Sequence, residues 1–105
     1  MNWNVEFYNT NLYNDLMKWP ANIKGHFIRI VKMIEQYGAN LGMPYTRSMG
    51  DGLFEIRAKG KEGIGRAFFC YVKKQRVIIL HGFIKKTQHT PRKEIKIAKQ
   101  RMKEV

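Results

Sequence analysis

The residues best suited to chemistry lie in the last quarter of the chain, where an apolar stretch runs directly into a polar and basic one. After Leu80–Ile84 the sequence reads Lys85, Lys86, Thr87, Gln88 and His89. Lysine can neutralise negative charge on a phosphate, and histidine can transfer a proton near neutral pH. The pattern therefore predicts a site at the rim of a sheet that holds, and could cut, a phosphodiester backbone. For His89 alone, the competing interpretation is an ordinary exposed residue at a loop tip.

Two arginines on neighbouring predicted strands, Arg57 and Arg66, form the second candidate. An arginine in a strand must stay in contact with water or with a partner, because its charge is costly to bury alone. Two guanidinium groups side by side repel each other unless an anion lies between them, and phosphate matches the guanidinium fork. The alternative interpretation is that Glu55 or Glu62 pairs with these arginines on a solvated face.

Aromatic side chains supply a third candidate feature, because an aromatic ring near a basic sheet face can stack on an unpaired base. Tyr45, in a predicted loop, and Tyr71, on the second strand of the predicted meander, are the candidates. Phe68 and Phe69 are neighbours on the same strand and must point to opposite faces, so at least one of them is expected in the core.

Other reactive residues carry weaker signals. His81 lies inside an apolar strand, which favours a core or supporting role, and His26 is expected to be simply exposed on an outer helix. Cys70, the single cysteine, reads as a buried thiol, and a chain with one cysteine fits a reducing cytoplasm. Histidine, cysteine and acidic residues do not cluster at metal-ligand spacing, so neither a metal nor another cofactor is expected.

The charge of the chain is divided unevenly. The formal net charge is +12, with four basic and three acidic residues in 1–40 and sixteen basic and five acidic residues in 41–105. A cationic second half indicates a polyanionic partner, the alternative being a generally basic protein without an anionic ligand. Apolar runs stay far below the ~20 residues that span a bilayer, and no signal peptide opens the chain, so we expect a cytoplasmic protein without membrane contact.

The elements that must position these residues can be read from the apolar spacing. An alternating strand over 3–8 precedes a short helix capped at Asn9–Asn11, and a second helix follows Pro20 and stops at Gly38. The first helix should bury Leu12, Leu16 and Trp19, and the second should bury Ile23, Phe27, Ile30, Val31, Ile34 and Tyr37.

The remainder of the chain is predicted as a loop over 39–52, three antiparallel strands over 53–59, 64–72 and 76–84, and a basic helix over 91–104. The expected fold is one α+β domain over residues 1–105. Its element order is strand, two helices, three antiparallel strands and helix, with the helical hairpin packed on the sheet.

Three segments together resemble a known family. Leu53–Arg57, Gly65–Tyr71 and His81–Pro91, followed by a basic helix, resemble the RelE/ParE toxin superfamily, specifically its phage-derived HigB-like branch. The resemblance covers nearly the whole chain. It implies a small curved antiparallel sheet backed by an N-terminal helical hairpin, with a C-terminal basic helix.

The resemblance also implies a function. It implies the toxin of a type II toxin–antitoxin system, a metal-independent endoribonuclease that enters the ribosomal A site and cleaves mRNA. The ribose 2′-OH would attack the adjacent phosphate and leave a 2′,3′-cyclic phosphate and a 5′-OH. The expected partner is an antitoxin with a helix-turn-helix domain. The alternatives are a non-enzymatic ParE-like inhibitor of DNA gyrase and an inactive RNA-binding module.

Matching the motif gives roles to individual residues. Arg57 and Arg66 would stabilise charge on the phosphate, and Lys85 and Lys86 would bind phosphate or assist proton transfer. The general base is left open among Lys85, Lys86 and His89. The residues expected to bind RNA without taking part in the chemistry are Tyr45, Tyr71, Gln88, Arg92 and Lys93.

Overall fold

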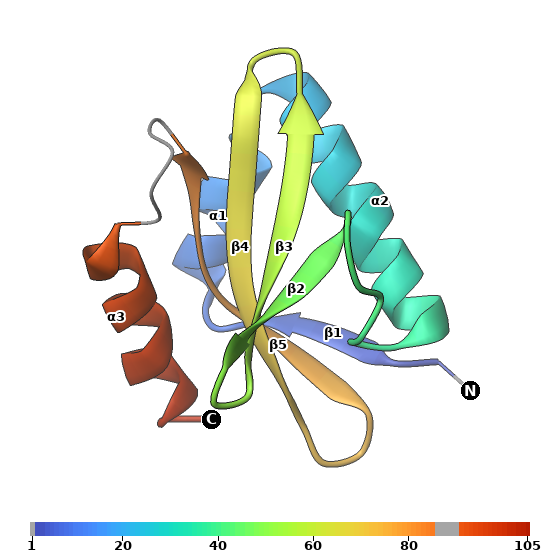
Figure 1. The fold of residues 1–105 in the computed structure, drawn as a ribbon, viewed down its shortest axis with the longest axis vertical. Coiled ribbons are helices and arrows are strands. Elements are labelled where there is room, and N and C mark those ends of the chain that lie inside the picture. The colour runs from blue at the N-terminus through green and yellow to red at the C-terminus, as the bar shows by residue number, and fades with distance from the viewer. Residues whose placement is uncertain (1, 86–90) are drawn as a thin grey trace.

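The computed structural model describes residues 2–85 and 91–105, and it shows a twisted five-stranded sheet with helices packed against it (Figure 1). The elements in chain order are β1 (Asn4–Phe7), α1 (Thr10–Met17), α2 (Ala21–Tyr37), β2 (Thr46–Gly50), β3 (Leu53–Gly60), β4 (Gly63–Val72), β5 (Arg76–Lys85) and α3 (Arg92–Met102). The α+β fold class expected from the sequence is confirmed. Among the described residues, no helix combines the length and the apolar character needed to cross a membrane.

The sheet has the strand order β1-β5-β4-β3-β2, and its details correct the sequence analysis twice. β2 to β5 form an antiparallel meander, but β1 pairs with β5 in parallel, so the sheet is mixed. β2 was expected to be loop, because Thr46–Gly50 shows no apolar alternation and lies among glycines and a proline. It is a short outer strand with a register shift after Ser48, and such irregular edge strands leave little signal in a sequence.

Local signals in the sequence explain where both N-terminal helices begin and end. The Asn9 side chain accepts a hydrogen bond from the Leu12 N–H at 2.8 Å, which caps α1. α2 follows Pro20 and stops at Gly38, whose φ of +101° favours glycine. The predicted helix faces are confirmed at seven residues, which are buried: Leu12, Leu16, Trp19, Ile23, Phe27, Ile30 and Ile34. Two predictions for the second helix were wrong, because Val31 is only partly buried and Tyr37, in the last turn, is 70% exposed.

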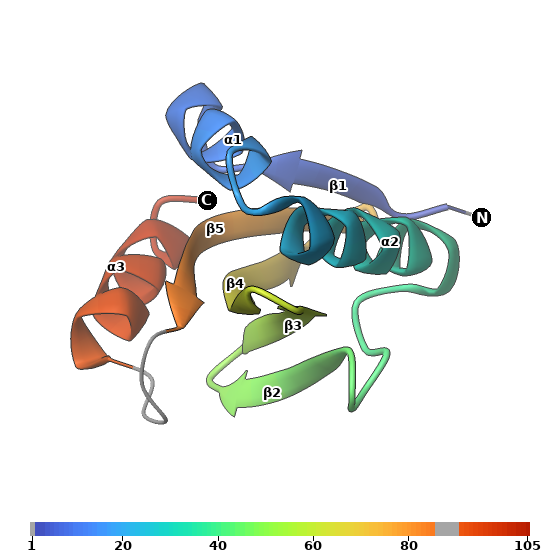
Figure 2. The same cartoon turned by 90° about the horizontal axis from the view of Figure 1, so that it is seen from above.

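The helical hairpin covers one face of the sheet. Figure 2 shows α2 lying over the sheet, and the buried strand residues beneath the two helices are Ile56, Ala58, Ala67, Phe69, Val77 and Ile79. The approach is close where β4 carries Gly65, since a Cβ there would lie 2.6 Å from the Trp19 ring. This face forms the larger of two cores.

The opposite face of the sheet is covered in part by α3. Its buried residues are Leu53, Phe68, Cys70, Ile78, Leu80 and Ala98, with Phe83, Ile95 and Met102 packed at the margin. Phe68 and Phe69 are both fully buried, one in each core, because both faces are covered. A strand between two covered faces loses the alternation that would show in its sequence.

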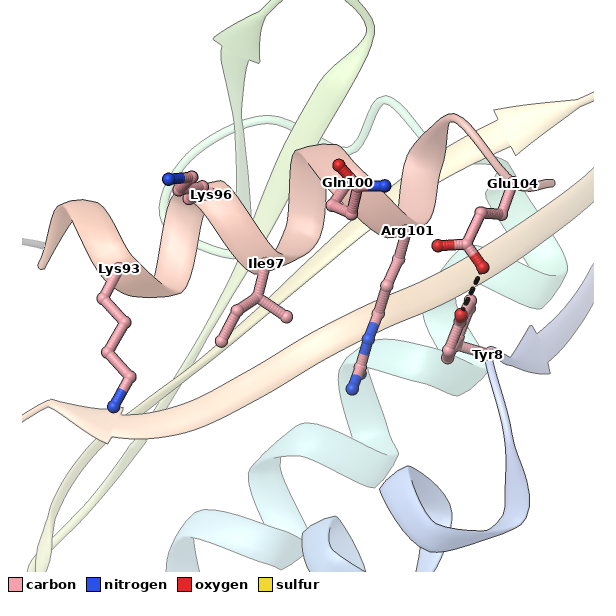
Figure 3. Close-up of a pocket in the computed structure, with 7 residues that line it drawn as sticks. All are labelled: Tyr8, Lys93, Lys96, Ile97, Gln100, Arg101 and Glu104. Atoms are coloured by element: carbon pink, nitrogen blue, oxygen red, sulfur yellow. Dashed lines mark hydrogen bonds between the residues drawn. The ribbon is translucent and has the colours of Figure 1, made fainter.

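Polar contacts fix both ends of α3. Near its start, Glu94 meets His81 of β5 at 2.9 Å, and near its end the Arg101 guanidinium donates to the Leu80 carbonyl at 2.8 Å. The Tyr8 hydroxyl donates to Glu104 at 2.7 Å, and Arg101 lies 4.6 Å from the centre of the Tyr8 ring (Figure 3). These contacts hold α3 against β5 and the end of β1.

A β-bulge in β5 decides which side chains share a face with Arg66. Phe68 pairs with His81 but Phe69 pairs with Ile79, so Leu80 is an extra residue in β5. An extra residue reverses the alternation of every residue beyond it. His81 and the residues that alternate with it beyond the bulge, Phe83 and Lys85, therefore lie on the α3 side of the sheet.

Candidate functional site

Rows of facing residues run across β3, β4 and β5 on the α3 side of the sheet. In one row Arg57 lies directly opposite Arg66, which lies opposite Phe83. A second row ends in Lys85, which lies opposite Ile64. Residues that face each other across antiparallel strands are neighbours on one face. The structure therefore brings together Arg57, Arg66 and Lys85, as the candidate site requires.

A buried carboxylate lies under this group. Glu55 is fully buried, and both of its oxygens accept hydrogen bonds from Nη1 of Arg66, at 3.0 and 3.3 Å. Arg47 of β2 donates to the same carboxylate through Nε at 3.1 Å. Pairing of Glu55 with an arginine was one of the two alternatives left open by the sequence, but the pair is buried instead of solvated. The carboxylate holds Arg66, itself 3% exposed, in one position.

Arg57 is placed differently from Arg66. It is half-buried, its backbone N–H donates to the Tyr45 carbonyl at 2.9 Å, and its Nε has no hydrogen-bond partner among the described residues. A buried donor without a partner is unfavourable and is usually explained by a ligand, a water or an ion. Because Arg57 is also more exposed than Arg66 and forms no ion pair among the described residues, it is the better placed of the two arginines to contact a bound anion.

Positive charge dominates the group. Loss of solvent around the ammonium lowers the pKa of Lys85, and the positive charges of Arg66, Arg57 and Arg47 lower that pKa further, while Glu55 opposes them. Four cations thus act with one carboxylate, which leaves a formal excess of three positive charges among these five residues. A bound phosphate would reduce the repulsion between the cations.

Aromatic rings border the cations on the α3 side. Phe83, partly buried, faces Arg66, and its ring lies 5.9 Å from that of Phe68 and 6.4 Å from that of His81. Sequence reasoning missed Phe83, because an unbroken alternation would place it on the helical-hairpin side with Ile79. The strand is apolar on both sides of the bulge, so its sequence carries no mark of the extra residue. His81 bonds Glu94 of α3, which agrees with the supporting role expected for it.

Other predicted residues lie elsewhere. Tyr71 is on the helical-hairpin side of the sheet, with its ring edge-on to Trp3 at 6.0 Å, and Tyr45 is partly buried against the same core. Arg92 and Lys93 are exposed on the first turn of α3, where Lys93 lines a groove of about 590 Å³ beside Tyr8 (Figure 3). The predicted residues outside the described part of the chain are Lys86, Gln88 and His89.

The remaining histidine, His26, corrects an expectation. Its Nδ1 accepts a hydrogen bond from the backbone N–H of Lys59 at 2.8 Å, so it is not simply exposed but caps the edge of β3 beyond the start of β2. Loss of solvent lowers the pKa of His26, and the positive charge of Arg29 contributes. Cys70 is buried as expected, and burial raises the pKa of its thiol. Residues 2–85 and 91–105 contain no group of three metal-ligating side chains.

The arrangement suits charge stabilisation on a phosphate. Guanidinium groups can donate to non-bridging oxygens, and in a partly desolvated site each such donor is worth more than in water. An amine with a lowered pKa, such as that of Lys85, can exchange a proton closer to neutral pH than an ordinary lysine. The site therefore offers anion binding and a candidate for proton transfer on one sheet face.

Comparison with known proteins supports the assignment of the fold. Residues 14–103 match the family described as phage derived protein Gp49-like (DUF891). The fold is similar to RelE of Pyrococcus horikoshii, solved as a RelE–RelB complex, with 17% identity and a TM-score of 0.58 over 80% of this chain and 96% of that one.

The E. coli toxin RelE, solved in the free state as a double arginine-to-alanine mutant, is similar too. Its identity is 9% and its TM-score 0.57, over 100% of this chain and 99% of that chain. No curated protein matches the sequence. The resemblance to the RelE/ParE superfamily that the sequence indicated is confirmed by the family match and the shared fold. The chain belongs to the phage-derived Gp49-like family and has the fold of the RelE toxins.

Proposed function

We propose that this chain is the toxin of a type II toxin–antitoxin system, acting in the cytoplasm as an endoribonuclease that cleaves mRNA in the ribosomal A site. The observation that carries the proposal is the group of Arg57, Arg66 and Lys85 on one sheet face, with more positive charge than Glu55 neutralises. The Gp49-like family and the RelE fold support it.

The reaction would be an attack by the ribose 2′-OH on the adjacent phosphate, with loss of the 5′-oxygen of the next nucleotide. Arg57 and Arg66 would donate to the non-bridging oxygens, which gain negative charge in the transition state. Glu55 would act as a positioning residue, because it fixes Arg66 before the substrate arrives. Preorganised donors of this kind need no rearrangement during the reaction.

Proton transfer would involve Lys85 or a neighbour. The lowered pKa of Lys85 increases the fraction of neutral amine, which can accept the 2′-OH proton, and the ammonium form can protonate the leaving 5′-oxygen. Lys86 and His89 remain candidates for the same roles by their sequence positions. Phe83 would offer a ring beside the phosphate on which a base can stack.

Transcript mapping after induced expression tests the proposal. We expect new 5′ ends within translated messages, no cuts in a matched message that lacks a start codon, and no cuts with Arg57→Ala at equal abundance. Arrest of DNA replication with protein synthesis intact would instead favour the gyrase-inhibitor alternative. Cuts in untranslated RNA would contradict dependence on the ribosome.

One observation favours the alternative of an RNA-binding module without activity. Arg66 is committed to a buried ion pair with Glu55, which leaves Arg57 and Lys85 as the cations without an ion pair among the described residues of the group. A protein of that kind would bind single-stranded RNA and leave it intact on programmed ribosomes, while Arg57→Ala would weaken the binding.

A partner antitoxin is also proposed. RelE of Pyrococcus horikoshii is solved with RelB, and by analogy we expect this chain to bind an antitoxin, with a helix-turn-helix domain as the specific expectation. Co-expression with the short reading frame next to its gene should restore growth and yield a stable complex. Failure of that neighbour to bind or protect would contradict this part of the proposal.

A further inference from the structure

A second basic hollow lies at the far end of β3, beside the first half of α2. Its volume is about 500 Å³, and its lining residues are Asn22, His26, Arg29, Lys59, Gly60 and Lys61. We refer to it as the α2 pocket. Its lining includes none of the residues of the candidate site, Arg57, Arg66 and Lys85.

The lining of the α2 pocket has the composition of an anion site. Arg29, Lys59 and Lys61 supply three cations. The adjacent carboxylate, Glu62, accepts from the Asn22 side chain at 3.0 Å and from its backbone N–H at 3.4 Å, so it is already engaged at the start of α2. Counting Glu62, the formal charge around the pocket is still +2. A pocket with this charge attracts a phosphate.

His26 adds a donor to the lining. Because its Nδ1 accepts the Lys59 N–H, the neutral ring must carry its proton on Nε2, which can only donate. The pKa of His26 is lowered by loss of solvent and by the charge of Arg29, so this tautomer is the form present at neutral pH. The imidazole therefore offers a hydrogen bond to an anion without adding a charge.

The α2 pocket is continuous with the candidate site through β3. Lys59 is two residues beyond Arg57 on the same strand, about 7 Å along it, and alternates with it to the α3 side, whereas α2 covers the other side. The two sites therefore meet around the edge of β3, where the Lys59 backbone N–H contacts His26 of α2. Lys59 is exposed, and it lines the pocket with Arg29 and Lys61. A single strand of nucleic acid that reaches Arg57 can follow this edge without leaving a cationic surface.

We propose that the α2 pocket binds a backbone phosphate of the same RNA strand whose cleavage occurs at Arg57 and Arg66, with Lys59 contacting the strand between them. This inference rests on the proposed function, since it assumes RNA at the first site. A protein partner fits less well, because no apolar side chain lines the pocket and protein interfaces are usually centred on apolar or aromatic anchors. The pocket would contribute affinity and strand register.

The test uses the full chain and a single-stranded RNA with 2′-O-methyl groups, which cannot be cleaved. Affinity is measured between about 50 and 200 mM salt for the wild type and for Arg29→Gln/Lys61→Gln. Each neutralised phosphate adds about −0.7 to the slope of log affinity against log salt, so loss of the one phosphate in the pocket should reduce the slope by about 0.7, or about 2.6-fold over this range. Thermal melting checks that the variant is folded.

Lys73→Gln/Lys74→Gln is the matched control. It removes the same charge at the β4–β5 turn, at the opposite end of β4 from the β3–β4 turn (Figure 1), and both lysines are exposed. The control should keep the wild-type slope. On programmed ribosomes, Arg29→Gln/Lys61→Gln should weaken RNA binding but cleave at the wild-type rate at saturation.

Three results would overturn the inference. The first is an equal salt slope for the α2-pocket variant and the wild type, and the second is an equal reduction of the slope in that variant and in the control. The third is a loss of antitoxin binding with RNA binding unchanged. The last result would assign the α2 pocket to a protein partner. A wild-type chain that binds RNA through the α2 pocket but never cleaves would overturn only the proposed enzymatic function, so the two failures are distinguishable.

Discussion

At the scale of single residues, the buried Glu55 organises a site that is otherwise cationic. Its carboxylate binds Arg66 and Arg47, and both oxygens are used. The two arginines of the candidate site therefore differ in kind. Arg66 is 3% exposed and forms an ion pair with Glu55, whereas Arg57 is half-buried and forms no ion pair among the described residues. Mutations at the two positions should have different consequences.

Arg57→Ala should abolish most activity and leave the fold intact. Removing one preorganised donor to a transition-state oxyanion typically slows the chemical step by about 100- to 1,000-fold. Single-turnover cleavage on programmed ribosomes measures the effect, and urea unfolding should show little change. Arg76→Ala, which removes an arginine from an exposed pair with Glu6, is the control. Wild-type cleavage by Arg57→Ala would show that this arginine is only a surface charge.

Arg66→Ala should reduce stability as well as activity. Removing one partner of a buried ion pair leaves a buried charge with less compensation and typically costs about 3–5 kcal/mol. Urea unfolding measures the loss. Glu55→Leu/Arg66→Leu removes both partners and should be more stable than Arg66→Ala, because no buried charge remains. A double variant that is less stable than the single variant would contradict this account of the pair.

Lys85 predicts a pH dependence with a definite sign. If the neutral amine is the general base, the single-turnover rate should rise with pH and level off above the pKa of Lys85, which lies below the ordinary lysine value. Arg47→Gln removes a positive charge that lowers this pKa, so the plateau should begin at higher pH. Arg76→Gln should leave the profile unchanged. A profile that Arg47→Gln does not move would exclude Lys85 as the group that titrates.

The sequence predicted the neighbouring positions of Arg57 and Arg66, because strand alternation and a short turn determine them. It could not predict that Glu55 is buried, since that depends on tertiary packing and on its ion pairs with Arg66 of β4 and Arg47 of β2. The position of Phe83 was also beyond sequence reasoning, because it depends on the single extra residue Leu80 in a strand that is apolar throughout.

At the scale of elements, close contact between the α1–α2 hairpin and the sheet depends on glycine in β4. A Cβ at Gly65 would lie 2.6 Å from the Trp19 ring and 2.8 Å from the Ile23 side chain. Neither neighbour can move far, because both are in the core. The register of the helices on the sheet therefore depends on glycine at this position.

Gly65→Ala should destabilise the chain by about 1–3 kcal/mol, as overpacking of a core usually does. Gly25→Ala is the matched control. Gly25 lies in α2 with no atom within 4 Å of an added Cβ, and alanine there should stabilise by about 1 kcal/mol because its helix propensity is higher. Urea unfolding should show a lower free energy of unfolding for Gly65→Ala and a higher one for Gly25→Ala than for the wild type. A neutral Gly65→Ala would show that the helices can shift away from the sheet.

The elements that sequence reasoning found are those with strong local signals. α1 and α2 have caps, stops and apolar faces at helical spacing, and β3 alternates. β2 was missed and the parallel pairing of β1 with β5 was not foreseen. β1 and β2 each have five residues or fewer and lie at the edges of the sheet, where pairing depends on tertiary packing more than on the sequence of the segment itself.

At the scale of the whole molecule, the two cores share one sheet, so we predict that residues 1–105 unfold as a single cooperative domain. Phe27 is fully buried and its ring lies 5.4 Å from that of Trp19. Phe27→Ala should destabilise the chain by about 3–5 kcal/mol. Tryptophan fluorescence and far-ultraviolet circular dichroism should show coincident urea transitions for the wild type and the variant. Separate transitions would indicate two independently folding units.

The short outer strands of the sheet have a consequence for self-association. An open strand edge is a template for cross-β pairing between copies, and long flat edges favour fibrils. Here β1 has four residues and β2 has five, with a register shift after Ser48. Beyond the start of β2, the His26 ring accepts the hydrogen bond of the Lys59 N–H that would otherwise recruit another strand. The chain should therefore resist amyloid formation even when it accumulates, and His26→Ala would open the most accessible point of nucleation.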